Sequence, residues 1–368
     1  MKDSGEIVGI GLSFATGVAA GAALFNHSSH IPASLPSVLA LLLPIIIVVL
    51  FVVSDSSRPR RGAFHALFLT AGLFCSINAC LGSGIPLPQG SLTRLAAAWG
   101  ERLKTLIDGI PYPSETTAPL VKALLTGDRS GLDRTTVMIF RSSGASHILA
   151  LSGLHLGILY LILRRLTYPL GNSPGARKFR FILTLSSASL YTLMTGASPS
   201  IVRAFLYITI GETASLLDRH KDPAAILLSA LTIQLALKPE VITSLGFQLS
   251  YLAMAGITFI YPGLSGLYPE GKNLAGRIDP MRKIWQGAVL SISCQAFTAP
   301  LAWYRFHTFP KYFLITNLTA LPLTSAVMVL SVTTIALSGT GICPGEIVAL
   351  NDKAVGLLVS CLEIISSL

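Results

Sequence analysis

Residues 140–163, FRSSGASHILALSGLHLGILYLIL, are the stretch that decides how this chain folds. The apolar part is long enough to cross a bilayer, and we expect one continuous helix over 147–163. His147, Ser152 and His155 lie within it, and the two histidines should fall near one helix face, about 12 Å apart. Polar groups at membrane depth are costly and face a bundle interior or a water-filled path. The pattern predicts a lined path, and the alternative is that the histidines only bind neighbouring helices.

The amino-acid composition is that of a membrane protein. Of its 368 residues, 52% are hydrophobic and 12% charged, with a mean hydropathy of +0.66, which predicts an all-α polytopic membrane protein. The net charge of +10 suits a polyanionic ligand or an anionic membrane face. The cysteines lack metal-ligand spacing and are interpreted as small core residues, so we expect no metal and no cofactor. They are Cys75, Cys80, Cys294, Cys343 and Cys361.

Apolar segments recur along the whole chain and predict about 10–11 transmembrane helices. They cover residues 7–25, 37–53, 64–82, 147–163, 180–197, 200–217, 223–238, 243–262, 285–303, 312–336 and 347–365. In the first segment, Gly17 and Gly21 are four residues apart, which favours close helix packing. Pro300 and Pro322 are expected to break their helices, because a proline cannot donate a backbone hydrogen bond.

Lys and Arg are distributed unevenly between the short loops, which predicts the orientation. Fourteen of them fall in the loops of one side, in the stretches 58–61, 164–180, 219–221 and 272–283. The loops of the other side carry only Lys238, Arg305 and Lys311. We therefore expect the N-terminus to lie inside.

The segment 83–146 then lies outside and contains an amphipathic helix over 91–110. This helix is too polar to span, so we expect it in the outer interface with Trp99 at headgroup level, or else packed on the bundle. Three parts result. They are a three-helix membrane segment over 1–82, the outer segment over 83–146 and a channel-forming bundle over 147–368.

Several motifs together resemble the membrane channel domain of the ComEC family of bacterial competence proteins. LLTGDRSGL at 124–132 is followed by SHILALSGLHLG at 146–157 and GASPSIVRA at 196–204. GFQLSY follows at 246–251, and QAFTAPLAWYRF at 295–306 is followed by TNLTALP. The resemblance implies a multi-pass channel of the bacterial cytoplasmic (inner) membrane that translocates single-stranded DNA into the cytoplasm during natural transformation.

Full-length members of that family resemble three modules, of which this sequence shows one. Few residues separate the third apolar segment from the amphipathic helix, which leaves no room for an outer OB-like domain. The metal motif His-x-His-x-Asp-His of the nuclease domain does not occur in the sequence. We therefore expect a channel core without enzymatic activity, either as a natural short form or as a fragment.

Candidate site residues fall into two groups. The Arg203 guanidinium is suited to binding phosphate, and the alternative is that it pairs with Glu212. Two helix starts are also expected to face incoming DNA with their positive ends, one capped by Ser146 and the other by Ser198 followed by Pro199. The residues expected to line the path are His147, Ser152, His155, Arg203, Gln248, Ser250, Gln295 and Asn317. The residues expected to contact the DNA backbone outside are Arg94, Arg102, Lys104, Arg129, Arg134 and Arg141.

The expected partners are single-stranded DNA and the lipid bilayer. An outer-side DNA receptor, a cytoplasmic motor or single-strand-binding proteins, and a separate nuclease would complete the process. The alternative function is an ion- or proton-coupled transporter of another anionic substrate, with His147 and His155 as a proton relay. DNA binding should weaken steeply with salt, whereas a coupled transporter should bind one small solute with a pH optimum.

The loop charges predict a measurable topology. A reporter fused after Gly90 should read outside, and one placed within 172–178 should read inside, because the Lys and Arg residues are concentrated in one set of loops. A pair of reporters that responds to either compartment measures this. Reversal of either reporter would contradict the orientation.

Overall fold

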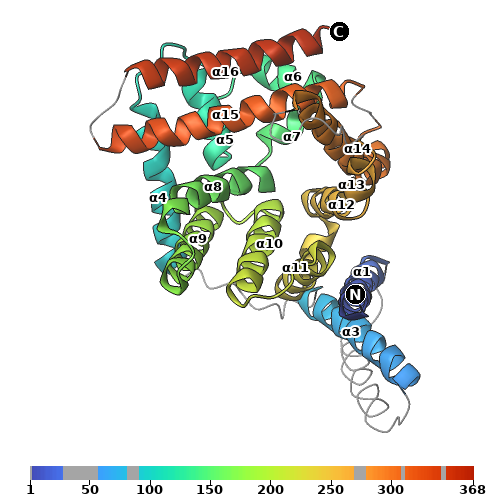
Figure 1. Cartoon of the computed structure of the whole chain (residues 1–368). Coiled ribbons are helices and arrows are strands. Elements are labelled where there is room, and N and C mark those ends of the chain that lie inside the picture. The colour runs from blue at the N-terminus through green and yellow to red at the C-terminus, as the bar shows by residue number, and fades with distance from the viewer. Residues whose placement is uncertain (1, 28–56, 81–90, 269–278, 308–310, 341–344) are drawn as a thin grey trace. The chain divides into compact units, whose positions relative to one another are not determined.

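The computed structural model describes residues 2–27, 57–80, 91–268, 279–307, 311–340 and 345–368 (Figure 1). Within these ranges the chain forms helices and no strand, which confirms the all-α prediction. The predicted segment 37–53 lies outside the described residues.

The chain divides into two compact units. Unit 1 comprises 1–88 and 206–255, and unit 2 comprises 89–205 and 256–368. The boundaries fall inside α10 (Pro199–Leu216) and α12 (Leu245–Phe259). Unit 1 thus joins the N-terminal helices to a segment from the middle of the chain, a grouping that the three-part division by sequence does not contain.

Unit 1 is built on the pair α1 (Lys2–His27) and α3 (Ser57–Cys80), against which α11 (Pro223–Leu237) packs, followed by the short helix η2 (Pro239–Thr243). Its buried core gathers aromatic and aliphatic side chains from these elements and from α12. They are Phe14, Val18, Leu227, Leu235, Val241, Phe247 and Tyr251. One polar pair accompanies them, because the Tyr251 hydroxyl donates to Gln234 Oε1 at 2.9 Å.

The contact between α1 and α3 depends on glycine. A Cβ added at Gly17 would overlap the backbone carbonyl of Leu69, and one added at Gly72 would overlap that of Phe14. A Cβ at Gly21 would lie 2.8 Å from Ser76 Cβ. The backbones therefore approach closely, and the packing predicted from Gly17 and Gly21 is confirmed.

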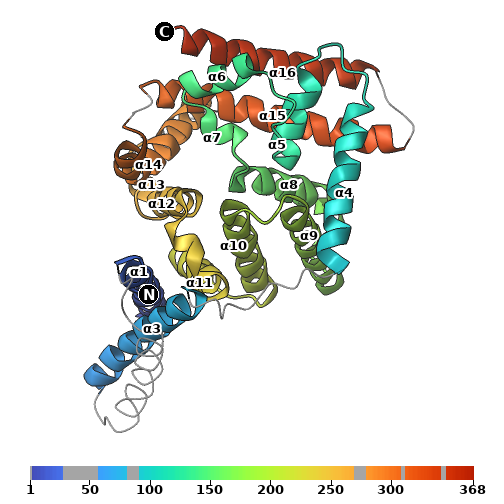
Figure 2. The same cartoon turned by 180° about the vertical axis from the view of Figure 1, so that it is seen from behind.

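Unit 2 contains the remaining helices. Their bounds are α4 (Ser91–Asp108), α5 (Thr117–Thr126), α6 (Arg134–Ser142), α7 (Ser146–Leu149), α8 (Gly153–Leu166), η1 (Tyr168–Leu170), α9 (Pro174–Met194), α13 (Tyr261–Ser265), α14 (Pro280–Phe306), α15 (Phe313–Gly339) and α16 (Gly345–Ser366). The helices α15 and α16 lie side by side in both views, and α4 lies along α9 (Figures 1 and 2).

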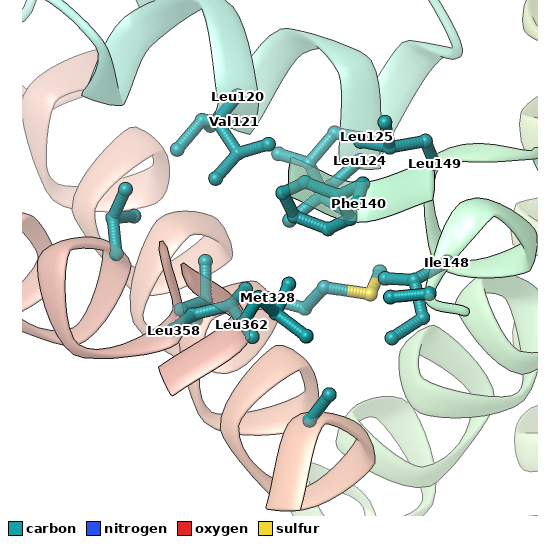
Figure 3. Close-up of a cluster of buried hydrophobic side chains, with 14 of the residues drawn as sticks. Leu120, Val121, Leu124, Leu125, Phe140, Ile148, Leu149, Met328, Leu358 and Leu362 are labelled. Carbon is teal, nitrogen blue, oxygen red and sulfur yellow. The ribbon is translucent and has the colours of Figure 1, made fainter. Parts of the chain in front are cut away.

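The core of unit 2 joins the short helices α5, α6 and α7 to the long helices α15 and α16. Figure 3 shows Phe140 of α6 beside Leu124 of α5, and Met328 of α15 reaching Ile148 of α7. Leu358 and Leu362 of α16 complete the cluster. The short helices α5 and α6, which were not predicted, supply much of this core.

The amphipathic helix predicted over 91–110 is confirmed as α4, which ends two residues earlier. Its buried stripe includes Ala96 and Ile107, and at Gly100 an added Cβ would lie 3.3 Å from the Met194 carbonyl of α9. A second apolar stripe stays exposed, with Leu95 and Trp99 about half accessible. Packing on the bundle therefore occupies one flank of α4 and leaves another flank open.

Most predicted apolar segments correspond to helices, with three corrections. The helix expected over 147–163 is wrong, because it divides into α7 and α8. Pro300 and Pro322 do not break their helices, since α14 and α15 continue through them. A proline removes one backbone donor, which a helix in an apolar bundle tolerates.

One helix among the described residues, α15, is both long and apolar enough to cross a membrane. Shorter apolar helices occur at 7–23, 65–77, 223–237 and 245–259.

Replacing Gly17 with alanine should destabilise the protein. The new methyl group overlaps the Leu69 carbonyl, and overpacking of this kind costs about 1–3 kcal/mol. Gly211→Ala is the matched control in the same unit, because a Cβ there meets nothing within 4 Å. Thermal unfolding in mild detergent measures both variants, and equal stabilities would contradict the close contact.

Candidate functional site

The candidate site is built around a break in the stretch 147–163. The helix α7 ends at Leu149, the backbone is extended at Ala150 and Ser152, and α8 begins at Gly153. Ser152 Oγ accepts from the Leu154 N–H at 3.2 Å, and His155 Nδ1 accepts from the Ser152 N–H at 3.1 Å. This is a capping box in which histidine takes the place of Glu or Gln. A serine followed by glycine is a good helix start, and this explains why the apolar stretch divides here.

The break places the two histidines on different helices. His155 has no exposed surface, and His147 is exposed with its Nδ1 3.1 Å from the Gly144 carbonyl oxygen. The prediction that both lie on one face of one helix is therefore wrong. Because His155 Nδ1 accepts a hydrogen bond, the neutral ring carries its proton on Nε2. Nε2 is buried and has no hydrogen-bond partner among the described residues.

The LLTGDRSGL loop holds this break in place. Arg129 Nε donates to the Leu149 carbonyl at 3.0 Å, which satisfies an acceptor at the end of α7. Gly127 has a left-handed backbone with φ of 79°, and an added Cβ would overlap the Leu151 side chain. Two motifs that the sequence places about twenty residues apart thus form one structural feature.

Asp128 fixes the shape of the same loop. Its Oδ1 accepts from the Ser130 N–H at 3.0 Å and from the Ser130 hydroxyl at 2.7 Å. Its Oδ2 lies 3.1 Å from Lys104 Nζ of α4. The hydrogen bonds from Ser130, together with Lys104, hold the pKa of the Asp128 carboxyl well below its usual range.

The second helix start is that of α10, which begins at Pro199 as predicted. The Ser198 carbonyl accepts from the N–H groups of Ile201 and Val202 at 3.0 Å each. The Ser198 hydroxyl is buried and has no partner in the described part of the chain, so it does not supply the expected cap. Ser146 is not a cap either, because it is the first residue of α7 and Ala145 precedes it.

The N-terminal turns of α8 and α10 meet at Gly153. A Cβ added there would lie 2.7 Å from Arg203 Nη2 and 3.0 Å from Ala204 Cβ. The Arg203 guanidinium therefore lies against the first turn of α8, and the residue is only 8% exposed. His155 and Arg203 thus both belong to unit 2.

The electrostatics of this meeting point favour anions. Helix N-termini carry partial positive charge, which attracts anions and repels cations. The N–H groups of Leu154, Ile201 and Val202 themselves already bond to Ser152 or Ser198. A buried guanidinium adds a full positive charge at the same place. The sequence from 134 to 211 contains eight Lys or Arg residues and no Asp or Glu. Glu212, further along α10, is the next carboxylate in the chain.

The other predicted path residues divide between the units. Gln295 is half-buried in α14 and Asn317 lies in α15, both in unit 2. Asn317 Oδ1 is buried without a partner among the described residues. Gln248 and Ser250 belong to unit 1, where Gln248 Nε2 donates to the Ile242 carbonyl at 2.8 Å.

The predicted outer cations differ in how much they are engaged. Arg94, Arg134 and Arg141 are exposed, and the Arg102 guanidinium lies 5.9 Å from the centre of the Trp99 ring. Lys104 is bound by both Glu101, at 2.9 Å, and Asp128. Arg129 uses its Nε to hold the Leu149 carbonyl.

Sequence reasoning missed several residues of the site. Gly127, Leu151 and Gly153 matter because of their contacts, and only the Ser-Gly pair at 152–153 gave a local signal, that of a helix start. The buried hydroxyls of Ser293 and Thr324 also have no partner in the described ranges. No group of three or more His, Cys, Asp or Glu side chains that could hold a metal occurs in the part of the chain that the structure describes.

Comparison with known proteins gives a family and two relatives. The family model for the Competence protein matches residues 124–368. ComE operon protein 3 of Bacillus subtilis is 31% identical over 198 residues, which cover 54% of this chain and 23% of that protein. The uncharacterized protein YcaI of Escherichia coli is 24% identical over 256 residues, covering 67% of this chain and 33% of that protein.

The matched region thus spans about a quarter to a third of the length of these relatives. No solved structure matches the chain.

The Asp128 carboxylate should stabilise the protein in a pH-dependent way. Its pKa is lower in the folded chain, so its stabilisation is present above about pH 4, the unfolded value, and is lost as the pH falls through the folded value. Asp128→Asn should therefore lower stability by roughly 1 kcal/mol near neutral pH, and the difference should shrink below about pH 4.

Thermal unfolding from about pH 3 to 8 measures this difference. Glu115→Gln, which removes an exposed carboxylate before α5, is the control. A deficit of Asp128→Asn that stays constant down to the lowest pH would contradict the role assigned to the charge.

Proposed function

Because the chain belongs to the Competence protein family, we propose that it is a multi-pass channel of the bacterial cytoplasmic membrane that carries single-stranded DNA inward during natural transformation. The proposal draws on the family, on the apolar composition and on the resemblance of the quoted motifs. The observation that carries it is the Arg203 guanidinium against Gly153, where two helix N-termini meet.

A single DNA strand presents one negative charge per phosphate, and its path needs polar or cationic contacts that hold each phosphate weakly. The N-terminal ends of α8 and α10 carry partial positive charge, and the Arg203 guanidinium adds a full positive charge beside them. The buried position strengthens this attraction because less water screens it. We assign the first intramembrane phosphate contact to this point.

Other residues would extend the path on either side. The exposed Arg94, Arg102, Arg134 and Arg141 can meet the strand outside, where long-range attraction raises the rate of encounter. His155, whose buried Nε2 has no partner among the described residues, and Asn317 offer further polar groups in unit 2. Lys104 and Arg129 contribute less in this arrangement, since both bind other parts of the protein.

The proposal gives this chain a transport role and assigns catalysis to other proteins. A receptor outside would deliver DNA, and a motor or single-strand-binding proteins in the cytoplasm would supply direction. A separate nuclease would remove the complementary strand. No catalytic residue, metal or cofactor enters the mechanism derived from these residues.

The alternative function, a proton-coupled transporter of another anion, depends on two histidines alone. Its relay would use His147 and His155, which the break puts on different helices, and His155 Nδ1 already accepts from the Ser152 N–H. A pH optimum for transport of a small anion, together with salt-independent DNA binding, would favour the alternative over the channel.

Removing or displacing the Arg203 guanidinium should slow DNA uptake. Arg203→Gln removes the charge, and the loss of one charged hydrogen bond corresponds to a decrease of about 10- to 100-fold. Gly153→Ala keeps the charge but pushes the guanidinium away, because its Cβ would lie 2.7 Å from Nη2. The measurement is the uptake rate of labelled DNA, normalised to monodisperse protein after detergent extraction.

Gly157→Ala is the matched control, since it lies one turn further along α8 and its Cβ would meet nothing within 4 Å. It should leave the rate per folded molecule unchanged. Normal rates per folded molecule in both Arg203→Gln and Gly153→Ala would refute the proposed path.

A further inference from the structure

A second cationic feature lies at the other end of α8. The chain leaves α8 at Leu166, forms η1 and enters α9 at Pro174. We call residues 164–180 the hairpin tip. It contains five Lys or Arg residues and no Asp or Glu. Neither the DNA path nor the core of unit 2 uses these charges.

The hairpin tip has a fixed shape. Arg180 Nη2 donates to the carbonyls of Thr167 and Gly171, at 3.2 and 2.9 Å, and so joins α9 to the end of α8. Gly171 has a left-handed backbone with φ of 69°. Ser173 Oγ accepts from the Ala176 N–H at 3.2 Å and caps α9. Arg180 is thus a structural residue that holds the turn, and the other cations are presented on a rigid support.

Large apolar side chains alternate with the cations on this support. Leu166 is 71% exposed and Tyr168 is 79% exposed, and Leu170 and Phe179 are also more than half exposed. Arg164, Arg165 and Lys178 are exposed between them. Arg164 Nη1 donates to the Tyr160 hydroxyl at 2.7 Å, and its guanidinium lies 5.9 Å from the centre of the Tyr160 ring.

This combination matches the boundary of a bilayer. Aromatic and aliphatic side chains of an interfacial segment enter the acyl boundary, and Lys and Arg beside them bind lipid phosphates. A nucleic acid would bind the cations through its phosphates and could stack its bases on Tyr168 and Phe179. It would leave the exposed aliphatic side chains of Leu166 and Leu170 without a binding partner. Charge and apolar exposure together therefore favour lipid.

We propose that the hairpin tip is a binding site for anionic phospholipid, with Leu166, Tyr168 and Leu170 in the headgroup boundary and Arg164, Arg165 and Lys178 on the phosphates. The inference uses the membrane location in the proposed function but does not use DNA transport. Its experiment has no transport readout, so either conclusion can fail without the other.

The test uses the full chain in neutral-detergent micelles, titrated with phosphatidylglycerol or with phosphatidylcholine, with thermal stabilisation as the readout. The wild type should be stabilised by phosphatidylglycerol at much lower concentrations than by phosphatidylcholine. In the variant Arg164→Gln/Arg165→Gln/Lys178→Gln the midpoint for phosphatidylglycerol should rise on the order of 100-fold, as expected for three cations at a lipid surface.

The control variant Arg219→Gln/Lys221→Gln/Arg305→Gln removes three exposed cations elsewhere and should raise the midpoint much less than the hairpin-tip variant. Lys178→Gln alone, which perturbs folding least, should raise the midpoint roughly 5-fold. Tyr168→Ser/Leu170→Ser should weaken the response to both lipids, because it removes apolar contacts and keeps the charges.

Three outcomes would overturn the proposal. The first is an unchanged midpoint in the triple and single variants, and the second is an equal response of the wild type to both lipids. The third is stabilisation by free glycerol phosphate as strong as that by the lipid. A single-stranded oligonucleotide that loses binding to the triple variant, while the lipid response stays intact, would assign the hairpin tip to nucleic acid instead.

Discussion

The hydrogen bond from Arg129 to the Leu149 carbonyl, together with the Ser152 cap, allows the apolar stretch to end one helix and begin another. An uninterrupted apolar segment of this length favours a single helix, because every backbone group is then satisfied internally. Dividing it exposes carbonyls at one end and N–H groups at the other. Arg129 satisfies the first set in part, and Ser152 with His155 the second. The partial positive charge at the start of α8 then lies beside the Arg203 guanidinium.

The surrounding helices keep this arrangement in place. Phe140 and Ile148 join the short helices to α15 and α16, and Asp352 of α16 accepts hydrogen bonds from Ser114 and Thr117 at the start of α5. Buried Asn351 donates to Ser331 Oγ at 3.1 Å and to the Tyr112 hydroxyl at 3.2 Å. Directional polar contacts of this kind specify one register between helices that apolar packing alone would leave less defined.

Much of the helical architecture follows from the sequence, because apolar length and periodicity determine where helices form. The start of α10 at Pro199 and the amphipathic α4 were predictable for this reason. The break at 150–152 was not, because it depends on Arg129 and Gly127, which become neighbours only in the fold. The meeting of Arg203 with Gly153 is likewise a tertiary contact, for which hydropathy carries no signal. Close packing of the first apolar segment was predictable from Gly17 and Gly21, because small residues four apart let helices approach. That α3 is its partner was not predicted.

That α1–α3 contact joins backbone to backbone, through Gly17 against the Leu69 carbonyl and Gly72 against that of Phe14. An interface of this type derives its cohesion from close approach and not from the size of the side chains around it. The outward-facing positions of both helices are therefore free to vary among apolar residues. We therefore expect homologues to keep these glycines while the apolar residues around them vary. Overall sequence identity in this part of the chain would then be low even where the helix contact is preserved.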